Sequence, residues 1–446
     1  MKKDIRVGFY CLVLALVWLV GCVSKPMPAL KPLQALENRT PVVFIPGISG
    51  SQLRERETGR VVWGRSKNFF RPRDGGYSLA LPVAPPSGAE DRLEAFAPLI
   101  RLSLLGFKID IYDSLLRTME SNGYRTGDLD APRPDDSFFF FAYDWRYGNA
   151  RATQALGRKL ENLRKARGEQ VLRIHLICHS NASLIARYFI KYGTASIEQA
   201  ERGLASPPSR IRVDKLILVG TANGGAMGTF EDLHRGRRYV PVLGRRFRPE
   251  VLFTFRSMFE ALPAYRLDLF VDEQGRELDV DLFDPRYWET HGWSLFEKEA
   301  QQRLARAKRD DLFGTAAQRK TYLARELYRS QRLQQLLIRD VEGFGATRYY
   351  FVQNVSRPTS DRALLVRVEG EWRTFFSTKR RGKRDDNLLP RLIAPGDGYA
   401  TKASQQWLSP QEQAAMAAPQ VDVPVYHRRI ILHPLALQKI LEFLLE

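Results

Sequence analysis

The sequence predicts an α/β fold with a mostly parallel central sheet and an inserted, mainly helical cap. Short apolar runs alternate with segments of helical periodicity, which is typical of parallel strands joined by crossover helices. The apolar runs are nearly continuous, as expected for strands that are buried on both faces. A long segment rich in aromatic, Arg and Glu residues interrupts this alternation and predicts the cap.

The expected elements run from residue 41 to the C-terminus. Apolar runs predict strands at 41–46, 137–143, 171–177, 213–219 and 348–355. Helical spacing of apolar residues predicts helices at 110–122, 150–166, 182–192, 294–309, 316–340 and 434–445. We therefore expect a core formed by residues 41–229 and 346–446, with the cap insertion at 230–345.

The N-terminus predicts export and a lipid anchor. Lys2, Lys3 and Arg6 precede an apolar run over 7–20, which is too short for a membrane span and is typical of a signal peptide. The run LVGC ends at Cys22 and resembles a bacterial lipobox, whose cysteine is lipidated. An ordinary signal peptide or an anchor helix with a stray cysteine is the alternative. We assign residues 1–21 to a lipoprotein signal and 22–40 to a tether. Val23 in place of Asp favours delivery to the outer membrane of a bacterial cell envelope.

Composition restricts the partners. The formal net charge is +19, and basic residues cluster at 234–250 and 379–384. No nucleic-acid-binding module is recognisable, so these clusters predict contact with anionic lipid head groups or lipopolysaccharide, or else solvated loops. Cys178 is the one cysteine that follows the signal and its lipobox cysteine Cys22, so the folded part of an exported protein must be stable without a disulfide. The sequence does not predict an oligomeric state.

Ser180 lies between an expected strand and an expected helix in LICHSNASLIARYF. A serine at such a turn is typical of the nucleophile elbow of α/β-hydrolases, which is normally written G-x-S-x-G. Cys178 and Ala182 replace the two glycines, so a serine that merely caps a helix also fits this short run.

A serine nucleophile needs a histidine base and an acid that orients the base. In the α/β-hydrolase fold both follow the serine in the chain, the acid first and the histidine second. Asp397 lies in the glycine-flanked turn PGDGY and is the candidate acid, with Asp385 and Asp386 as rivals. His427 and His433 both follow it and precede the last expected helix, so both are candidate bases.

An oxyanion hole needs two backbone amides aimed at the developing charge. Asn181, directly after the serine, supplies one candidate amide. Ile48, in the glycine-rich turn that follows the first strand, supplies the other. No cluster of His, Cys and Asp residues has the spacing of metal ligands, and we expect neither a metal nor a cofactor.

Six blocks together resemble the lecithin:cholesterol acyltransferase family, which includes lysosomal phospholipase A and bacterial relatives. In chain order they are PVVFIPGISGSQL, FAYDWR, LICHSNASLIARYF, LVGTANGGAMG, PGDGYATKAS and HRRIILHPLALQKILEFL. The resemblance implies Ser180 as nucleophile, Asp397 as acid and amides from Ile48 and Asn181, and its spacing before the last helix selects His427 as base. Tyr399 departs from the family pattern, where a small residue follows the acid loop.

The resemblance implies a serine-dependent lipid acyl hydrolase or O-acyltransferase of the phospholipase or lipase type. Its partners would be a phospholipid or another ester lipid and a membrane surface, reached through the lipidated N-terminus and the basic clusters. One alternative is a carboxylesterase for small or envelope-derived esters. The other, suggested by the missing glycines, is a catalytically inactive lipoprotein that binds the envelope.

Overall fold

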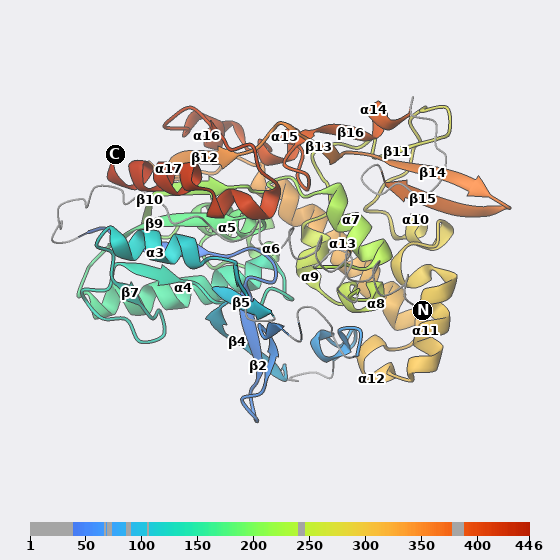
Figure 1. Cartoon of the computed structure of the whole chain (residues 1–446), viewed down its shortest axis with the longest axis horizontal. Helices are drawn as coiled ribbons and strands as arrows, with labels where there is room; N and C mark the ends of the chain where they lie inside the picture. The colour runs from blue at the N-terminus through green and yellow to red at the C-terminus, as the bar shows by residue number, and fades with distance from the viewer. Residues whose placement is uncertain are drawn as a thin grey trace, which may run out of the picture.

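The computed structural model describes residues 39–66, 68, 74–85, 91–104, 107–239, 246–376 and 388–446 (Figure 1). The predicted signal peptide, Cys22, nearly all of the tether, the basic run 379–384 and the rival acids Asp385 and Asp386 lie outside the described residues.

The centre of the fold is a seven-stranded sheet with the order β17-β12-β10-β9-β1-β8-β7. Every pair of neighbouring strands in it is parallel. The strands are β1 (Val42–Ile45), β7 (Thr126–Gly127), β8 (Phe138–Phe140), β9 (Leu172–His179), β10 (Ile211–Val219), β12 (Arg348–Gln353) and β17 (Val421–Asp422). The predicted parallel sheet is confirmed, and the five predicted strands are its longer members.

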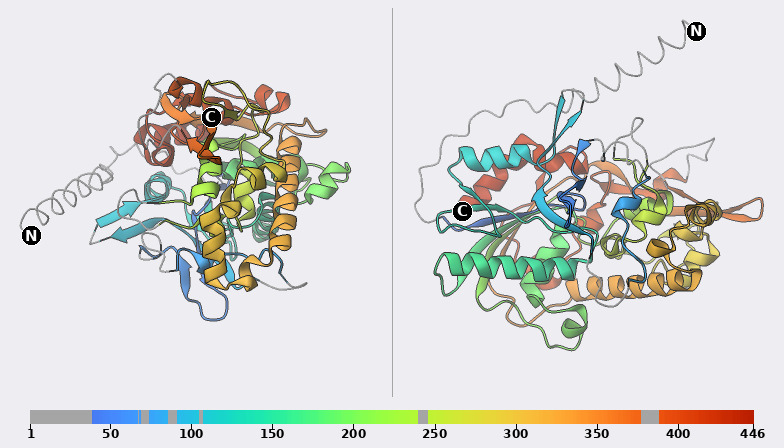
Figure 2. Two further views of the ribbon diagram at one scale, coloured as in Figure 1. Left: turned by 90° about the vertical axis from the view of Figure 1, so that its right-hand side faces the viewer. Right: turned by 90° about the horizontal axis from the view of Figure 1, so that it is seen from below.

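Helices cover both faces of this sheet (Figure 2). Val43 and Ile45 of β1 share a core with α4 (Asn149–Ala166) and α5 (Ala182–Tyr192). The alternate residues Val42 and Phe44 share a second core with α3 (Asp113–Ser121) and α17 (Pro434–Leu445). Successive side chains of a strand point to opposite faces, so one short apolar strand is buried on both sides.

The inserted region, which we define as residues 220–347 between β10 and β12, lies beside the sheet (Figure 1). Its elements are α7 (Met227–Arg235), α8 (Pro249–Leu252), α9 (Arg256–Glu260), β11 (Phe270–Val271), α10 (Pro285–Thr290), η2 (Ser294–Phe296), α11 (Lys298–Ala307), α12 (Asp310–Phe313) and α13 (Ala316–Leu337). It is mainly helical, but β11 pairs with β14 (Ala363–Val368), which pairs with β15 (Glu371–Phe376). A hairpin that follows β12 therefore completes the inserted region. The boundaries 230–345 stay a prediction.

Small antiparallel sheets that the sequence pattern did not predict precede β7. One has the order β3-β2-β4, with β2 (Ser51–Glu55), β3 (Val61–Trp63) and β4 (Leu93–Pro98), and the other pairs β5 (Arg101–Leu104) with β6 (Phe107–Asp110). The 3-10 turn η1 (Tyr77–Leu79) connects β3 to β4, and α6 (Ile197–Glu201) follows α5. No helix in the described part of the chain is both long and apolar enough to cross a membrane.

The C-terminal part adds the elements that follow the inserted region. These are β13 (Arg357–Ser360), α14 (Leu389–Leu392), β16 (Ile393–Gly396), α15 (Lys402–Gln405), α16 (Pro410–Ala414) and η3 (His427–Leu432). A buried ion pair fastens α16 to α5: Arg187 donates to both carboxylate oxygens of Glu412 at 2.7 and 2.8 Å, and both side chains are fully buried. Lys191 lies 3.3 Å from the same carboxylate. The helix α5 begins directly after the turn at Ser180, so this cluster of charged residues also helps to position that turn.

Candidate active site

Ser180 lies on a strained turn between β9 and α5. Its φ is +58°, in the left-handed region that residues other than glycine rarely adopt. Cys178 aligns with Ile45 of β1 and Leu218 of β10, and both Cys178 and Ala182 are fully buried. The strand-to-helix elbow therefore forms with cysteine and alanine in place of the usual glycines.

Three side chains distant in sequence meet at this elbow. The Oγ of Ser180 lies 2.9 Å from Nε2 of His427. The Nδ1 of the same ring lies 2.7 Å from Oδ2 of Asp397, whose side chain is fully buried. Since an ionised carboxylate only accepts hydrogen bonds, Nδ1 carries the ring proton and Nε2 is left to accept from the serine.

A pair of antiparallel strands, β13 and β16, holds Asp397 in place. Asp397 directly follows β16. The Oδ1 atom accepts from the backbone amides of Tyr399 and Ala400 at 2.9 and 2.8 Å, which leaves Oδ2 for the histidine. The hydroxyl of Thr359 on β13 accepts from the amide of Gly398 at 2.8 Å, and φ of Gly398 is +88°. The glycine after the acid is therefore required by backbone conformation.

His427 and His433 occupy different positions, although the sequence leaves both as candidate bases. His427 opens η3, and its backbone amide donates to the carbonyl of Asp397 at 2.9 Å. His433 is the N-cap of α17, where its Nδ1 accepts from the amide of Leu435 at 3.3 Å. The structure places His427, and not His433, in contact with Ser180.

The turn after β1 approaches the serine closely at Gly47. A Cβ atom on Gly47 would lie 2.9 Å from Cβ of Ser180 and 3.2 Å from the carbonyl oxygen of His179. Real Cβ atoms are essentially never found nearer than 3.0 Å, so only glycine fits here without displacing the nucleophile.

The two candidate oxyanion donors lie on either side of this close approach. The amide of Gly47 donates to the hydroxyl of Tyr112 at 3.3 Å, and that of Gly50 donates to the carbonyl of Gly47 at 3.0 Å. In contrast, the amides of Ile48 and Asn181 donate to no group among the residues described. Asn181 is also the N-cap of α5, so the positive end of the helix dipole lies beside the nucleophile.

Tyr112 is a residue that sequence reasoning missed. Its hydroxyl lies 3.0 Å from Nδ1 of His179 as well as accepting from Gly47. His179 is buried, and desolvation, with a smaller contribution from the charge on His427, lowers its pKa to about 3. A neutral His179 therefore supports the turn, as expected for the residue before the nucleophile, and Tyr112 joins it to Gly47. No sequence motif surrounds Tyr112 that would have indicated this contact.

The inserted region reaches the turn after β1 through Tyr239. The hydroxyl of Tyr239 hydrogen-bonds Oγ of Ser49, whose φ is +72°. The guanidinium carbons of Arg237 and Arg428 lie 4.9 and 5.4 Å from the centre of the Tyr239 ring. The Nε1 of Trp63 donates to the carbonyl of Ser49 at 2.9 Å, so this buried tryptophan is a core residue that orients the turn.

Tyr399 contacts the base directly. Its ring centre lies 5.1 Å from that of His427, and its hydroxyl lies 2.8 Å from Oγ1 of Thr229 on α7. The bulky side chain therefore packs between the imidazole and the inserted region.

A second buried carboxylate, that of Glu260, is linked to Asn181 through Asn149. Oε2 of Glu260 accepts from the amide of Asn149 at 2.6 Å, and Oδ1 of Asn149 accepts from Nδ2 of Asn181 at 2.8 Å. Burial raises the pKa of Glu260 to about 7, despite the opposing hydrogen bond from Asn149.

The FAYDWR block contributes a buried ion pair. The side chain of Arg146 is 1% exposed and donates to Oδ2 of Asp144 at 2.6 Å. It also pairs with Asp91 and donates to the carbonyl of Leu79 at 3.1 Å. Its position is structural, because it fastens the segment that leads to β4 against the core.

The parallel sheet, the flanking helices and the strained serine between β9 and α5 define an α/β-hydrolase. Residues 93–248 match the family described as lecithin:cholesterol acyltransferase, so the resemblance to that family is confirmed over this segment. The match contains the FAYDWR block and Ser180 but ends before Asp397 and His427. The fold and this partial family match together indicate a lipid acyl hydrolase or acyltransferase in general terms.

Comparison with curated proteins finds no relative of this chain. Among solved structures, a chain of the Tle4-Tli4 complex covers 92% of this chain and 99% of its own length at 13% identity, with a TM-score of 0.55. That likeness concerns the fold alone. A Bacillus licheniformis lipase, BlEst2 in mature form, is 12% identical over 94% of this chain and 95% of its own, with a TM-score of only 0.26.

Proposed function

We propose that this chain is a serine-dependent acyl hydrolase or O-acyltransferase that acts on ester lipids through an acyl-enzyme. The observation that carries the proposal is the continuous hydrogen-bonded series from Ser180 through His427 to Asp397 on the strained elbow. A structural helix cap would require neither the imidazole nor the buried carboxylate behind it.

We assign one chemical step to each group of the site. His427 Nε2 takes the proton of Ser180 as Oγ attacks the ester carbonyl, and Asp397 stabilises the imidazolium. The amides of Ile48 and Asn181 stabilise the oxyanion, and each such donor is typically worth about 10²–10³ in kcat. The imidazolium then protonates the leaving alcohol, and the acyl group remains on Ser180. Water or an alcohol, deprotonated by His427, finally removes it.

The alternative of an inactive fold rested on the missing elbow glycines. The positive φ of Ser180 and its contact with His427 argue against this alternative, because the elbow adopts its shape with Cys178 and Ala182 in place. A carboxylesterase for small esters would use the same three side chains. Comparing long-chain phospholipids with short-chain nitrophenyl esters separates the two, and equal kcat/KM for both would contradict the lipid assignment.

Labelling with a serine-reactive fluorophosphonate tests the mechanism. We expect the native protein to be labelled and Ser180→Ala to remain unlabelled. Equal labelling of both, or none of either, contradicts the proposed nucleophile. His427→Ala and His433→Ala form a matched pair, and only the first should abolish turnover. If His433→Ala alone abolished it, the assignment of the base would be wrong.

The placement of this chemistry at a bacterial membrane is also part of the proposal. It is supported by the signal-like N-terminus, the LVGC run at Cys22 and the strongly positive charge. Cells that express the chain and are fed radiolabelled palmitate should label the native protein and not Cys22→Ser. A Cys22→Ser protein that is labelled equally contradicts the anchor, and fractionation then shows whether the native protein enters the outer membrane.

A further inference from the structure

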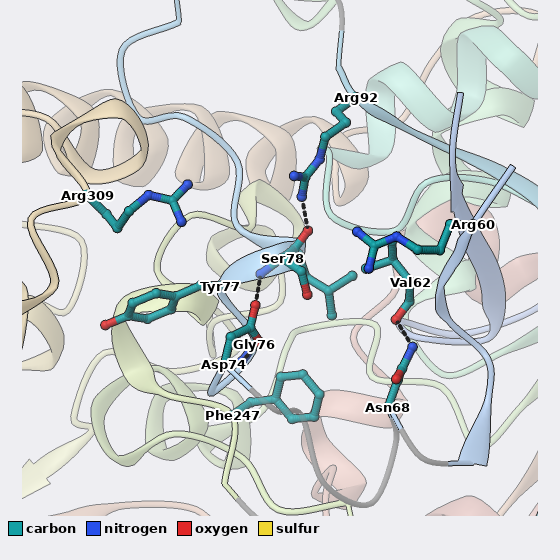
Figure 3. A pocket seen from close by; sticks show the side chains of 11 residues that line it. Arg60, Val62, Asn68, Asp74, Gly76, Tyr77, Ser78, Arg92, Phe247 and Arg309 are labelled. Atoms are coloured by element: carbon teal, nitrogen blue, oxygen red, sulfur yellow. Dashed lines mark hydrogen bonds between the residues drawn. The ribbon is translucent and has the colours of Figure 1, made fainter. Parts of the chain in front are cut away.

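A pocket of about 330 Å³ lies apart from Ser180, Asp397 and His427, none of which is among its described lining residues (Figure 3). Its volume is within the range of small-molecule sites. The walls come from the segment around β3, the segment around η1, the residue before β4, the segment before α8 and the segment before α12. Five separate stretches of the chain therefore converge on it.

The floor of the pocket is apolar. Val62, Leu79 and Phe247 line it and are 6%, 2% and 2% exposed. These side chains belong to the main hydrophobic core, so their positions are fixed by packing. The floor suits an apolar group of a ligand and offers it no hydrogen bond.

The rim is cationic. Arg60, Arg92 and Arg309 enter from three different segments, and their guanidinium groups point toward one another across the pocket (Figure 3). Arg60 and Arg309 use Nε and Nη2 to bind neighbouring carboxylates, and Arg92 uses Nη2 to bind the carbonyl of Ser78 at 2.7 Å. In the part of the chain that the structure describes, Nη1 of all three arginines makes no hydrogen bond or ion pair.

One carboxylate also lines the pocket, and its oxygens are engaged by the backbone. Oδ1 of Asp74 accepts from the amide of Gly76 at 2.9 Å, and Oδ2 accepts from the amide of Ser78 at 2.6 Å. These bonds hold the carboxylate against the turn that leads into η1. The described lining therefore contains three arginines and one carboxylate, and the backbone already donates hydrogen bonds to both oxygens of that carboxylate.

We propose that this pocket binds a phosphate monoester that carries an apolar substituent. Three guanidinium groups that converge from different directions match the three terminal oxygens of a phosphate ester, whereas a carboxylate offers only two. The apolar floor would receive the substituent. The site is independent of the proposed acyl chemistry, and its ligand is either a soluble phosphate ester or the phosphomonoester head group of a lipid.

Titration calorimetry on the full chain with octyl phosphate tests the site, because this probe has no carboxylic ester to cleave. Octyl phosphate should bind at least about tenfold more tightly than octanoate or inorganic phosphate, which lack the third terminal oxygen and the apolar substituent respectively. Equal affinity for octanoate and octyl phosphate would refute a phosphate site.

Two variants and a matched control assign the binding to the pocket. Arg92→Gln and Arg309→Gln should each weaken octyl phosphate binding by about tenfold, the loss of one charge-assisted hydrogen bond. Arg286→Gln is the control, because Arg286 also pairs with a carboxylate two residues away but lies outside the pocket. If Arg309→Gln and Arg286→Gln changed affinity equally, the effect would be one of net charge and the site would be refuted.

Vesicles that contain ether-linked phosphatidate, which cannot be deacylated, distinguish a lipid head group from a soluble phosphate ester as the ligand. Co-sedimentation that is lost in Arg92→Gln but retained in Arg286→Gln supports a lipid head group. Octyl phosphate binding without such co-sedimentation supports a soluble ester. If neither probe depends on Arg92, the proposal is wrong.

Discussion

Replacing Asp397 by Asn isolates the part of the carboxylate that orients the base. Oδ1 of Asp397 accepts from the amides of Tyr399 and Ala400, so the side-chain carbonyl of Asn must take this position. Its NH₂ group then occupies the place of Oδ2 and faces Nδ1 of His427, which lies 2.7 Å away in the native protein. Two donors cannot share this contact, so the ring proton moves to Nε2.

The proton on Nε2 then faces Oγ of Ser180, and His427 can no longer accept the proton of the nucleophile. The shape of the site is kept while the tautomer is wrong. In serine proteases, where this substitution is a reference case, such a change lowers kcat about 10⁴-fold, which corresponds to about 5.5 kcal/mol in activation free energy. We expect a loss of that order here, with little change in melting temperature.

The assay is kcat/KM for a nitrophenyl ester, with ¹⁵N NMR of the imidazole to report the tautomer. Asp284→Asn is a suitable control, because Asp284 caps α10 in the inserted region. It should retain native turnover. A loss of less than tenfold for Asp397→Asn, with the ring proton still on Nδ1, would refute the reasoning.

Three further outcomes are expected. Gly47→Ala places a Cβ 2.9 Å from that of Ser180, so kcat/KM should fall at least about tenfold for a stability loss of about 1–3 kcal/mol, compared by ester turnover and thermal melting. Burial raises the pKa of Glu260 from 4.5 to about 7, so the folded state holds a proton that the unfolded chain releases. Stability should therefore fall by about 3 kcal/mol as pH rises from 4.5 to 7, and urea titrations of Glu260→Gln should lack this slope. Glu412→Gln leaves Arg187 as an unpaired buried cation and should cost about 3–5 kcal/mol in chemical denaturation, without lowering kcat of the folded protein.

Local sequence pattern predicted the long elements well. The helices expected at 182–192 and 434–445 have these same bounds in the structure, because one ends at Gly193 and the other begins at Pro434. The strands before and after Ser180 were recognisable because strands buried on both faces carry unbroken apolar runs. Chain order and resemblance then selected Asp397 and His427, which the structure brings together with Ser180.

Contacts that depend on tertiary packing could not be predicted. The pairing of β11 with β14 joins strands from either side of β12, and a strand of two residues such as β11 is too short to show a periodic pattern. Tyr112 and Tyr239 reach the turn after β1 from distant segments, and an isolated tyrosine resembles any half-buried aromatic residue. Their roles follow from geometry that only the folded chain provides.

The proposed nucleophile is synthesised well before the residues proposed to activate it. Ser180 and both flanking elements precede the inserted region, whereas Asp397 and His427 follow it, as do β12 and β17 at one side of the sheet. A partly synthesised or C-terminally clipped chain would therefore hold an inert serine. Under the proposed mechanism, acyl transfer would require complete translation and intact residues up to η3, and unfinished copies of the protein would leave the ester lipids of the producing cell uncleaved.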